Sequence, residues 1–406
     1  MSLDLLCLIT ISSLAPLQGQ VRVVDAAGGP GAEFTSLRAA TLAADDGDVL
    51  LVRSGNYAIG QGPQLSGKGL IIVADDGAQV ATTHLEISDV PATSQVLLRG
   101  IHVQSVSGEG PLAVVLARNQ GPLWLEGCSV ETPLALDHGQ GGVQAVSCAA
   151  LVLVRATLQG PNPAPFLPGP HSLFCFESRT HLFESLIQGT RVDRSLAFAP
   201  TGAVDIVGGF LAAHGSEIRG ADGRDGVLFL CPESGFDGLV LRNAAQAELF
   251  DTLLSGGAAG GGTPAISCAP VVDGQASIVA DGSTLSLGAP EARSLSIPSP
   301  VRSNQSVQAT LVGQPGESVW IRYSSRAGQG LRSSLWDGEL LLGAPRAGQF
   351  VGVIPASGTL VLTQPAPSIA GGGDCLVLFV QAFFRASGGR FRASSPSTLV
   401  VLDPRF

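Results

Sequence analysis

The sequence predicts an all-β chain, a parallel β-helix solenoid followed by an antiparallel β-sandwich, and three observations support this. A ten-residue unit with strand-like alternation recurs six times between residues 96 and 256. The composition is 45% hydrophobic but only 14% charged, with 53 glycines, which is typical of many short strands joined by tight turns. After about residue 290 the repeat gives way to longer alternating runs separated by Gly and Pro.

The charge of the chain, its N-terminal segment and the length of its apolar runs limit the classes of partner and the location of the protein. The formal net charge is -10 and Lys68 is the only lysine, so the chain has no basic stripe for a nucleic acid. Residues 1–19 combine an apolar stretch with a small-residue zone, which favours a cleaved signal peptide and a secreted or cell-surface protein over a short buried strand. No apolar run reaches the roughly 20 residues that span a bilayer, so we expect no transmembrane segment in the mature chain.

Each repeat unit predicts two strands that meet at a corner. Apolar residues alternate at positions one and three and again at six and eight, and this shift of phase requires a bend. Gly100, Gly127 and Gly215 stand at the bend, where a permissive backbone is needed. The third positions should stack in one column, with insertions explaining their unequal spacing. This column holds Leu98, Leu125, Leu153, Leu182, Ala213 and Leu249.

A third strand in each turn is predicted by the pattern apolar, any residue, Cys. Its cysteines are Cys148, Cys175, Cys231 and Cys268. Three strands in roughly 28 residues form one coil of a parallel β-helix, with the cysteines stacked inside. Side chains stacked about 4.8 Å apart suit buried thiols better than disulfides, although Cys148–Cys175 and Cys231–Cys268 pairs stay open. A linear row of thiols does not suit zinc, so we expect no metal or other cofactor.

The start of this domain resembles pectin-lyase-like proteins. The segments that carry the resemblance are Val24–Ala40 and Asp45–Tyr57. The resemblance implies a right-handed parallel β-helix over residues 20–290, with a short N-terminal helix capping its open end. Thr35 or Ser36 fits the N-cap of such a helix.

The resemblance brings no set of catalytic residues with it. The paired acids and calcium-binding acidic ladders of pectin-degrading enzymes have no counterpart in the outward columns of the repeat. We single out Trp124 as an outward aromatic that could stack on a sugar, and Glu126 beside it. Coverage of Trp124 by the proline-rich insertion Pro161–Pro170 is an equally open alternative. Arg99 and Glu126 are more simply explained as a surface ion pair. Asp222, Arg224 and Asp225 form a loop that could bind a cation or a sugar acid, although a glycine-flanked turn is the simpler explanation.

Residues 294–406 predict a second domain, an antiparallel β-sandwich of the immunoglobulin or fibronectin type, and they resemble C-terminal modules of bacterial secreted proteins. The predicted strands are Ser306–Val312, Ser318–Tyr323, Gln349–Ile354, Gly358–Thr363, Leu376–Phe383 and Ser397–Leu402. Trp320 and Trp336 are expected in its core rather than on a binding surface.

Together these features favour an exported, non-catalytic β-helix scaffold or surface protein that can also bind a polysaccharide or cell-surface glycan. The alternative is a polysaccharide lyase or glycoside hydrolase whose acidic residues come from loops, acting on an extracellular polysaccharide that is either acidic or neutral. The sequence therefore leaves open whether the protein is an enzyme.

Overall fold

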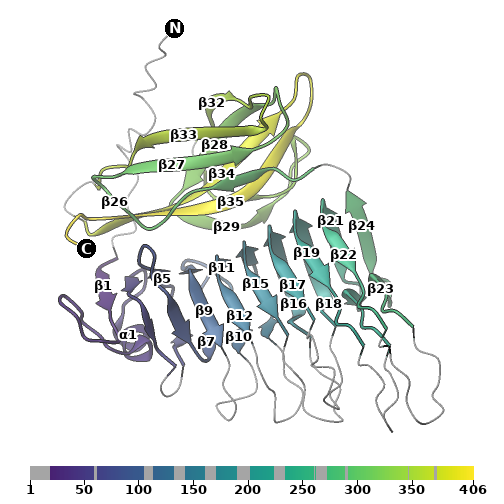
Figure 1. The fold of residues 1–406 in the computed structure, drawn as a ribbon, viewed down its shortest axis with the longest axis horizontal. Helices are drawn as coiled ribbons and strands as arrows, with labels where there is room; N and C mark the ends of the chain where they lie inside the picture. The colour runs from purple at the N-terminus through teal and green to yellow at the C-terminus, as the bar shows by residue number, and fades with distance from the viewer. Residues whose placement is uncertain are drawn as a thin grey trace.

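A computed structural model describes residues 19–58, 62–104, 113–131, 142–160, 171–189, 202–223, 234–259, 261, 272–288, 291–345, 347–369 and 373–406. It confirms the predicted fold class. A long stack of parallel strands is followed by antiparallel sheets, and α1 (Leu37–Ala43) is the one helix in the described ranges (Figure 1). The cysteines Cys231 and Cys268, and residues 1–18 of the predicted signal peptide, lie outside these ranges.

The parallel strands form a prism with three faces. The first face consists of β1 (Val21–Val24), β2 (Val49–Val52), β5 (Ile71–Ala74), β8 (Val96–Arg99), β11 (Leu123–Glu126), β14 (Leu151–Val154), the second halves of β16 (Leu173–Phe183) and β18 (Val204–His214), β21 (Gln246–Phe250) and β24 (Thr284–Gly288). The second face consists of β3 (Gly55–Asn56), β6 (Val80–Thr82), β9 (Ile101–Gln104), β12 (Ser129–Glu131), β15 (Thr157–Gln159), β17 (Leu186–Gln188), β19 (Glu217–Arg219) and β22 (Leu253–Ser255). The third face consists of β4 (Gln64–Ser66), β7 (Leu85–Ser88), β10 (Val114–Ala117), β13 (Val143–Val146), the first halves of β16 and β18, β20 (Leu239–Arg242) and β23 (Ser277–Val279).

The strand register confirms the predicted column of third positions. Leu125 pairs with Leu98 on one side and with Leu153 on the other. Leu182 pairs with Leu153 and with Ala213, which in turn pairs with Leu249. The varying spacing of the repeat is therefore insertion between strands, and the strands themselves stay in register.

The cysteine column is a correction to the sequence-based prediction. Cys175 pairs with Ala145, not with Cys148. Cys148 lies just beyond β13, where its backbone N–H donates to the hydroxyl of Ser178 at 3.0 Å. Cys128, Cys148, Cys175 and Cys375 are all buried and free, and of these the preference for thiols concerned Cys148 and Cys175. Burial raises the pKa of Cys128 to about 11 and that of Cys175 to about 12.

The predicted N-terminal helix is present as α1. Ser36 is its N-cap, and its hydroxyl accepts a hydrogen bond from the backbone N–H of Ala39 at 3.4 Å. Leu37 and Ala40 are buried against the end of the inner core. The helix therefore covers apolar residues that the first coil would otherwise expose.

The C-terminal part is a sandwich of two sheets. The smaller sheet contains β25 (Ser294–Ser296), β27 (Ser306–Val312) and β33 (Thr359–Pro365). The larger sheet contains β26 (Val301–Arg302), β35 (Phe391–Leu402), β34 (Cys375–Arg385), β28 (Ser318–Ser324), β32 (Gln349–Val353) and β30 (Trp336–Asp337), and a separate hairpin joins β29 (Arg326–Leu331) to β31 (Leu340–Gly343). All six runs predicted from the sequence are strands.

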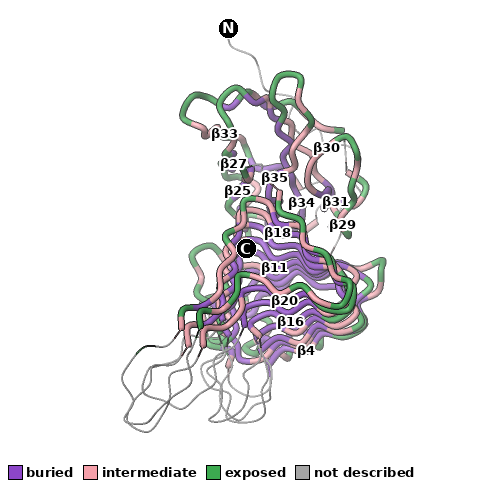
Figure 2. The backbone as a smooth tube through the Cα atoms, turned by 90° about the vertical axis from the view of Figure 1, so that its right-hand side faces the viewer, coloured by how far each residue is buried: buried purple, intermediate pink, exposed green. Residues whose placement is uncertain are grey.

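The sandwich packs on the outer side of the first face of the prism. Figure 1 shows it lying along the row of stacked strands, and Figure 2 shows buried chain between β11 and β35. One apolar cluster joins the two parts. The prism contributes Val21, Val49, Leu51, Ile71, Val73, Leu97, Trp124, Val152, Val154 and Phe183, and the C-terminal part contributes Ala327, Leu340, Leu341, Leu342, Cys375, Val377, Phe379, Phe383, Val400 and Leu402.

Candidate functional site

Trp124 does not lie on a ligand-binding surface. Its side chain points away from the inner core, as predicted, but it is fully buried by the sandwich and meets the ring of Phe379 edge-on at 5.0 Å. The expectation of an exposed aromatic is therefore wrong, because the alternation of β11 shows which way a side chain points and not what covers it. Phe183 is covered in the same interface and is 2% exposed.

Glu126 is a structural anchor between the two parts. It pairs with Arg99 at 2.7 Å and with Arg155, and it accepts hydrogen bonds from the Ser397 hydroxyl at 2.9 Å and from the backbone N–H of Thr398 at 2.9 Å. Burial would raise the pKa of Glu126, but the two guanidinium groups and the hydroxyls outweigh burial and hold the pKa below its usual value. The expected Arg99–Glu126 pair exists, but it is buried rather than on the surface.

A second polar cluster joins the two parts at β16, two coils further along the prism. Glu339 binds Arg179 at 3.0 Å and Arg332 at 2.8 Å, and its other carboxylate oxygen lies 2.5 Å from Nδ1 of the fully buried His181. Burial would raise the pKa of Glu339, but these three neighbours lower it strongly. Glu339 and His181 are enclosed, whereas the side chains of Arg179 and Arg332 are partly exposed, so the cluster joins the two parts at the edge of their interface.

The loop predicted as a cation or sugar-acid site forms internal contacts where it is described. Asp222 accepts a hydrogen bond from Arg219 at 3.2 Å and one from the backbone N–H of Ala258 at 2.9 Å. Arg224 and Asp225 lie outside the described residues. Among the described residues, no group of three His, Cys, Asp or Glu side chains is placed to hold a metal ion.

The open site of the prism is a shallow groove of about 830 Å³ along the corner between the first and second faces. It crosses successive coils from β3 to β12. Its lining is Ser54, Gly55, Asn56, Gly77, Gln79, Val80, Ala81, Gly100, Ile101, His102, Gly127 and Ser129. None of these side chains is a carboxylate or a guanidinium, so the groove offers mainly neutral hydrogen-bonding groups and exposed backbone.

The groove exists because glycines occupy the corner. Gly100 and Gly127 have φ values of 69° and 60°, and a Cβ added at Gly127 would meet nothing within 4 Å. In the next two coils, Arg155 and Glu184 take the same corner position with φ values of 50° each. Their long side chains, whose charged ends lie 3.7 Å apart, follow directly after the groove.

Polar side chains line one wall of this groove in register. Asn56, Ala81, His102 and Ser129 are successive Cα partners on the second face. Nδ1 of His102 lies 2.6 Å from the hydroxyl of Ser129, which fixes both side chains. The alternation of the repeat points His102 and Ser129 outward, but the sequence analysis did not select them as site residues. The signal available was a corner glycine followed two residues later by a polar side chain, in two consecutive coils.

An ionic cluster around the buried carboxylate of Asp205 lies on the outer side of the third face. The carboxylate of Asp205 is 3.3 Å from Nε2 of His171 and 3.1 Å from Arg242. Burial raises the pKa of Asp205 in spite of these neighbours, and burial lowers the pKa of His171. Asp205 is only 3% exposed, so its polar contacts are with His171 and Arg242 rather than with solvent.

Comparisons with known proteins identify no family for this chain. No protein-family description matches the chain, and no curated protein is significantly similar to it. Among solved structures, ORF18 of Geobacillus virus E2 is 9% identical with a TM-score of 0.28, over 88% of this chain and 70% of that chain. The enzymatically active domain of tailspike protein 2 from bacteriophage CBA120 is 11% identical with a TM-score of 0.19, over 88% of this chain and 72% of that chain.

These TM-scores are too low to support any argument about the site. The parallel-strand solenoid is established by the strand pairing itself, and the pectin-lyase-like resemblance stays a prediction. In the described part of the chain, no helix has the length and apolar character needed to cross a membrane.

Proposed function

We propose that this protein is an exported, non-catalytic β-helix scaffold that binds a glycan in the corner groove between the first and second faces. The observation that carries the proposal is the lining of the groove. It combines Asn56, Gln79, His102 and Ser129 with glycine corners, so that side chains and backbone groups can both bond to sugar hydroxyls. The prism holds its strands about 4.8 Å apart, which suits a ligand that is itself a repeating polymer.

The groove is best tested by filling it. Gly127→Arg copies the residue that follows the groove in the next coil, and Arg155 shows that an arginine is accepted at a φ of 50°. We expect Gly127→Arg to abolish retention on a glycan array that retains the unaltered protein. Gly127→Ala is the matched control, because it has the same left-handed backbone cost, about 1–2 kcal/mol, and leaves the groove open.

A second pair of variants tests the polar wall. His102→Ala should weaken glycan binding at least tenfold, since it removes a fixed hydrogen-bonding group. Thr157→Ala, in the same outward row but beyond the groove, should leave binding unchanged. Equal binding by all these variants, or no retention of the unaltered protein on any glycan, would argue against the groove as the site.

The alternative, a polysaccharide lyase or glycoside hydrolase, is favoured by one observation, the shifted pKa values of Asp205 and His171. Product formation from acidic and neutral polysaccharides separates the two proposals. The non-catalytic proposal expects no turnover. Turnover that disappears in Asp205→Asn, with the protein still folded, would replace it with the enzyme.

Export is part of the proposal and rests on residues 1–19 of the sequence. Expression with residues 1–19 present should yield extracellular protein that begins at or near residue 20. Retention of the full N-terminus inside the cell would contradict it.

A further inference from the structure

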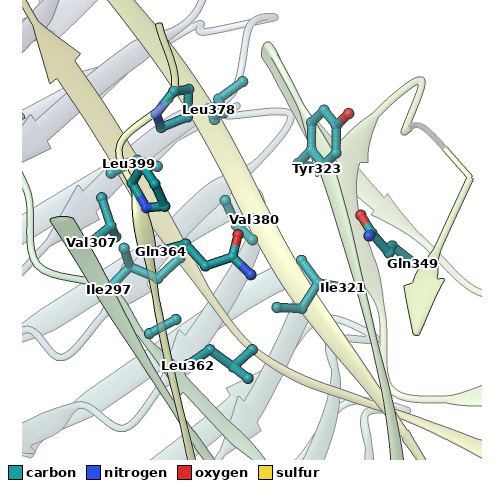
Figure 3. A pocket seen from close by; sticks show the side chains of 13 residues that line it. Ile297, Val307, Ile321, Tyr323, Gln349, Leu362, Gln364, Leu378, Val380 and Leu399 are labelled. Atoms are coloured by element: carbon teal, nitrogen blue, oxygen red, sulfur yellow. The ribbon is translucent and has the colours of Figure 1, made fainter. Parts of the chain in front are cut away.

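The sandwich contains an apolar cavity that is separate from the glycan groove. It has a volume of about 90 Å³ and lies between the two sheets. Figure 3 shows its side chains converging from both sheets. The lining is Ile297, Val307, Ala309, Ile321, Tyr323, Gln349, Leu362, Gln364, Pro365, Pro367, Leu378, Val380 and Leu399. The cavity lies where β27 and β33 of the smaller sheet face β28 and β34 of the larger sheet.

The lining of the cavity is mostly aliphatic and contains three polar side chains, which come from both sheets. The apolar residues are aliphatic, including Leu378 and Leu399, so an aromatic ligand would find few rings to pack against. The lining has no charged side chain. Its polar groups are the Tyr323 hydroxyl and the amides of Gln349 and Gln364, none of which bonds to another described side chain.

We propose that this cavity binds the alkyl end of a small, neutral amphiphile whose hydrogen-bonding head meets Tyr323, Gln349 and Gln364. Burying the alkyl end removes apolar surface from water, while the three uncharged polar groups replace the hydrogen bonds that the head makes with water. An engineered cavity of about 150 Å³ accommodates benzene, so this cavity takes a shorter alkyl segment and leaves the head at its rim. An anionic head is disfavoured because no cation lines the cavity to compensate its lost hydration.

The test uses the full chain and a series of 1-alkanols from butanol to decanol, with binding followed by titration calorimetry. Each added CH₂ should tighten the dissociation constant about fourfold until the cavity is full, since burying one CH₂ is worth about 0.8 kcal/mol. Octanoate should bind at least tenfold more weakly than 1-octanol. Absence of saturable binding, or affinity that does not depend on chain length, would overturn the proposal.

Two variants locate the site. Ala309→Leu puts three more carbons into the cavity and should weaken 1-octanol binding at least tenfold. Gln308→Leu, its neighbour on the outward side of β27, should bind as the unaltered protein does. Unchanged affinity in a folded Ala309→Leu variant would place the alkanol elsewhere and refute the cavity as the site.

Two further measurements keep the proposal specific. Tyr323→Phe should weaken the binding of all the alkanols by a similar factor and preserve the dependence on chain length, because it alters the contact with the head alone.

Vesicles of phosphatidylcholine present alkyl chains only within a bilayer. If the protein sediments with these vesicles but shows no saturable binding of free alkanols, the ligand is not a small soluble amphiphile and the proposal is wrong.

Discussion

The carboxylate of Glu126 links the two parts of the molecule at the scale of single residues. Sequence reasoning found its ion pair with Arg99, because both residues occupy the same outward column in adjacent coils. It could not find the hydroxyls of Ser397 and Thr398, which lie more than 270 positions away in the chain. The carboxylate of Glu126, which the sequence predicted in a weak surface ion pair, is therefore buried. The contacts that bury it come from residues distant in the sequence, so no local pattern predicts them.

Replacing Glu126 by Gln should destabilise the protein strongly. The change leaves Arg99 and Arg155 without their shared counter-charge in a buried interface, at a cost of about 3–5 kcal/mol. The measurement is the free energy of unfolding in urea. Glu131→Gln, an exposed carboxylate on the second face, is the control and should change it by less than about 0.5 kcal/mol. Similar changes in the free energy of unfolding in both variants would show that the ion pairs and hydrogen bonds of Glu126 do not stabilise the protein.

His214 should make stability depend on pH. It is stacked between Phe183 and Phe250, with ring centroids 5.0 Å and 4.7 Å away. Burial lowers its pKa to about 4, against 6.5 in the unfolded chain. Between these values the unfolded chain binds the proton more readily, so stability is lost as pH falls from 6.5 to 4, by roughly 3 kcal/mol.

His214→Phe keeps an aromatic ring in the stack and removes the titrating group. The difference in unfolding free energy between pH 7 and pH 4.5 should therefore be smaller in the variant than in the unaltered protein. An unchanged pH dependence in His214→Phe would mean that other groups cause it.

At the scale of elements, the sequence predicted the strands of the repeat well but placed one column wrongly. The Leu98 column was found because period-two alternation and a corner recur around it. The cysteine column failed because matching Cys148 to Cys175 ignored three residues of offset, and the structure pairs Cys175 with Ala145. A tripeptide that recurs without flanking alternation does not fix a register.

The four described cysteines should resist labelling in the folded protein. Cys128, Cys148, Cys175 and Cys375 are buried, and burial raises the pKa of each, so almost no reactive thiolate is present at neutral pH. Iodoacetamide followed by peptide mass spectrometry should find them unlabelled in native protein. All four should be labelled after denaturation without reductant. Protection of Cys148 or Cys175 in denatured, unreduced protein would indicate a disulfide.

The sequences of the strands in the first face indicate that its outer side is covered. β2, β11 and β14 are buried at every position. Strands buried on both sides are continuous apolar runs, whereas the strands of the second face alternate with polar residues. Leu151–Val154 is such a run, so the sequence contained the information that something covers the first face. It did not contain the identity of the cover.

At the scale of the whole molecule, the prism uses its three faces differently. The first face binds the sandwich through an apolar cluster and two polar networks, one around Glu126 and one around Glu339. The corner beside the second face keeps a polar groove open in its N-terminal coils. The division explains why the most conspicuous aromatic candidate, Trp124, is structural, while small polar residues beside glycines form the candidate site.

Hydroxyl-radical footprinting tests most directly that the first face is covered and the groove is open. The measurement is the oxidation of two side chains, Trp124 and His102. Trp is intrinsically the more reactive of the two residue types, so exposure and not chemistry must explain any protection of Trp124. The account predicts that Trp124, fully buried under Phe379, stays unmodified in the native protein while His102 in the groove is oxidised. Rapid oxidation of Trp124 together with protection of His102 would contradict it.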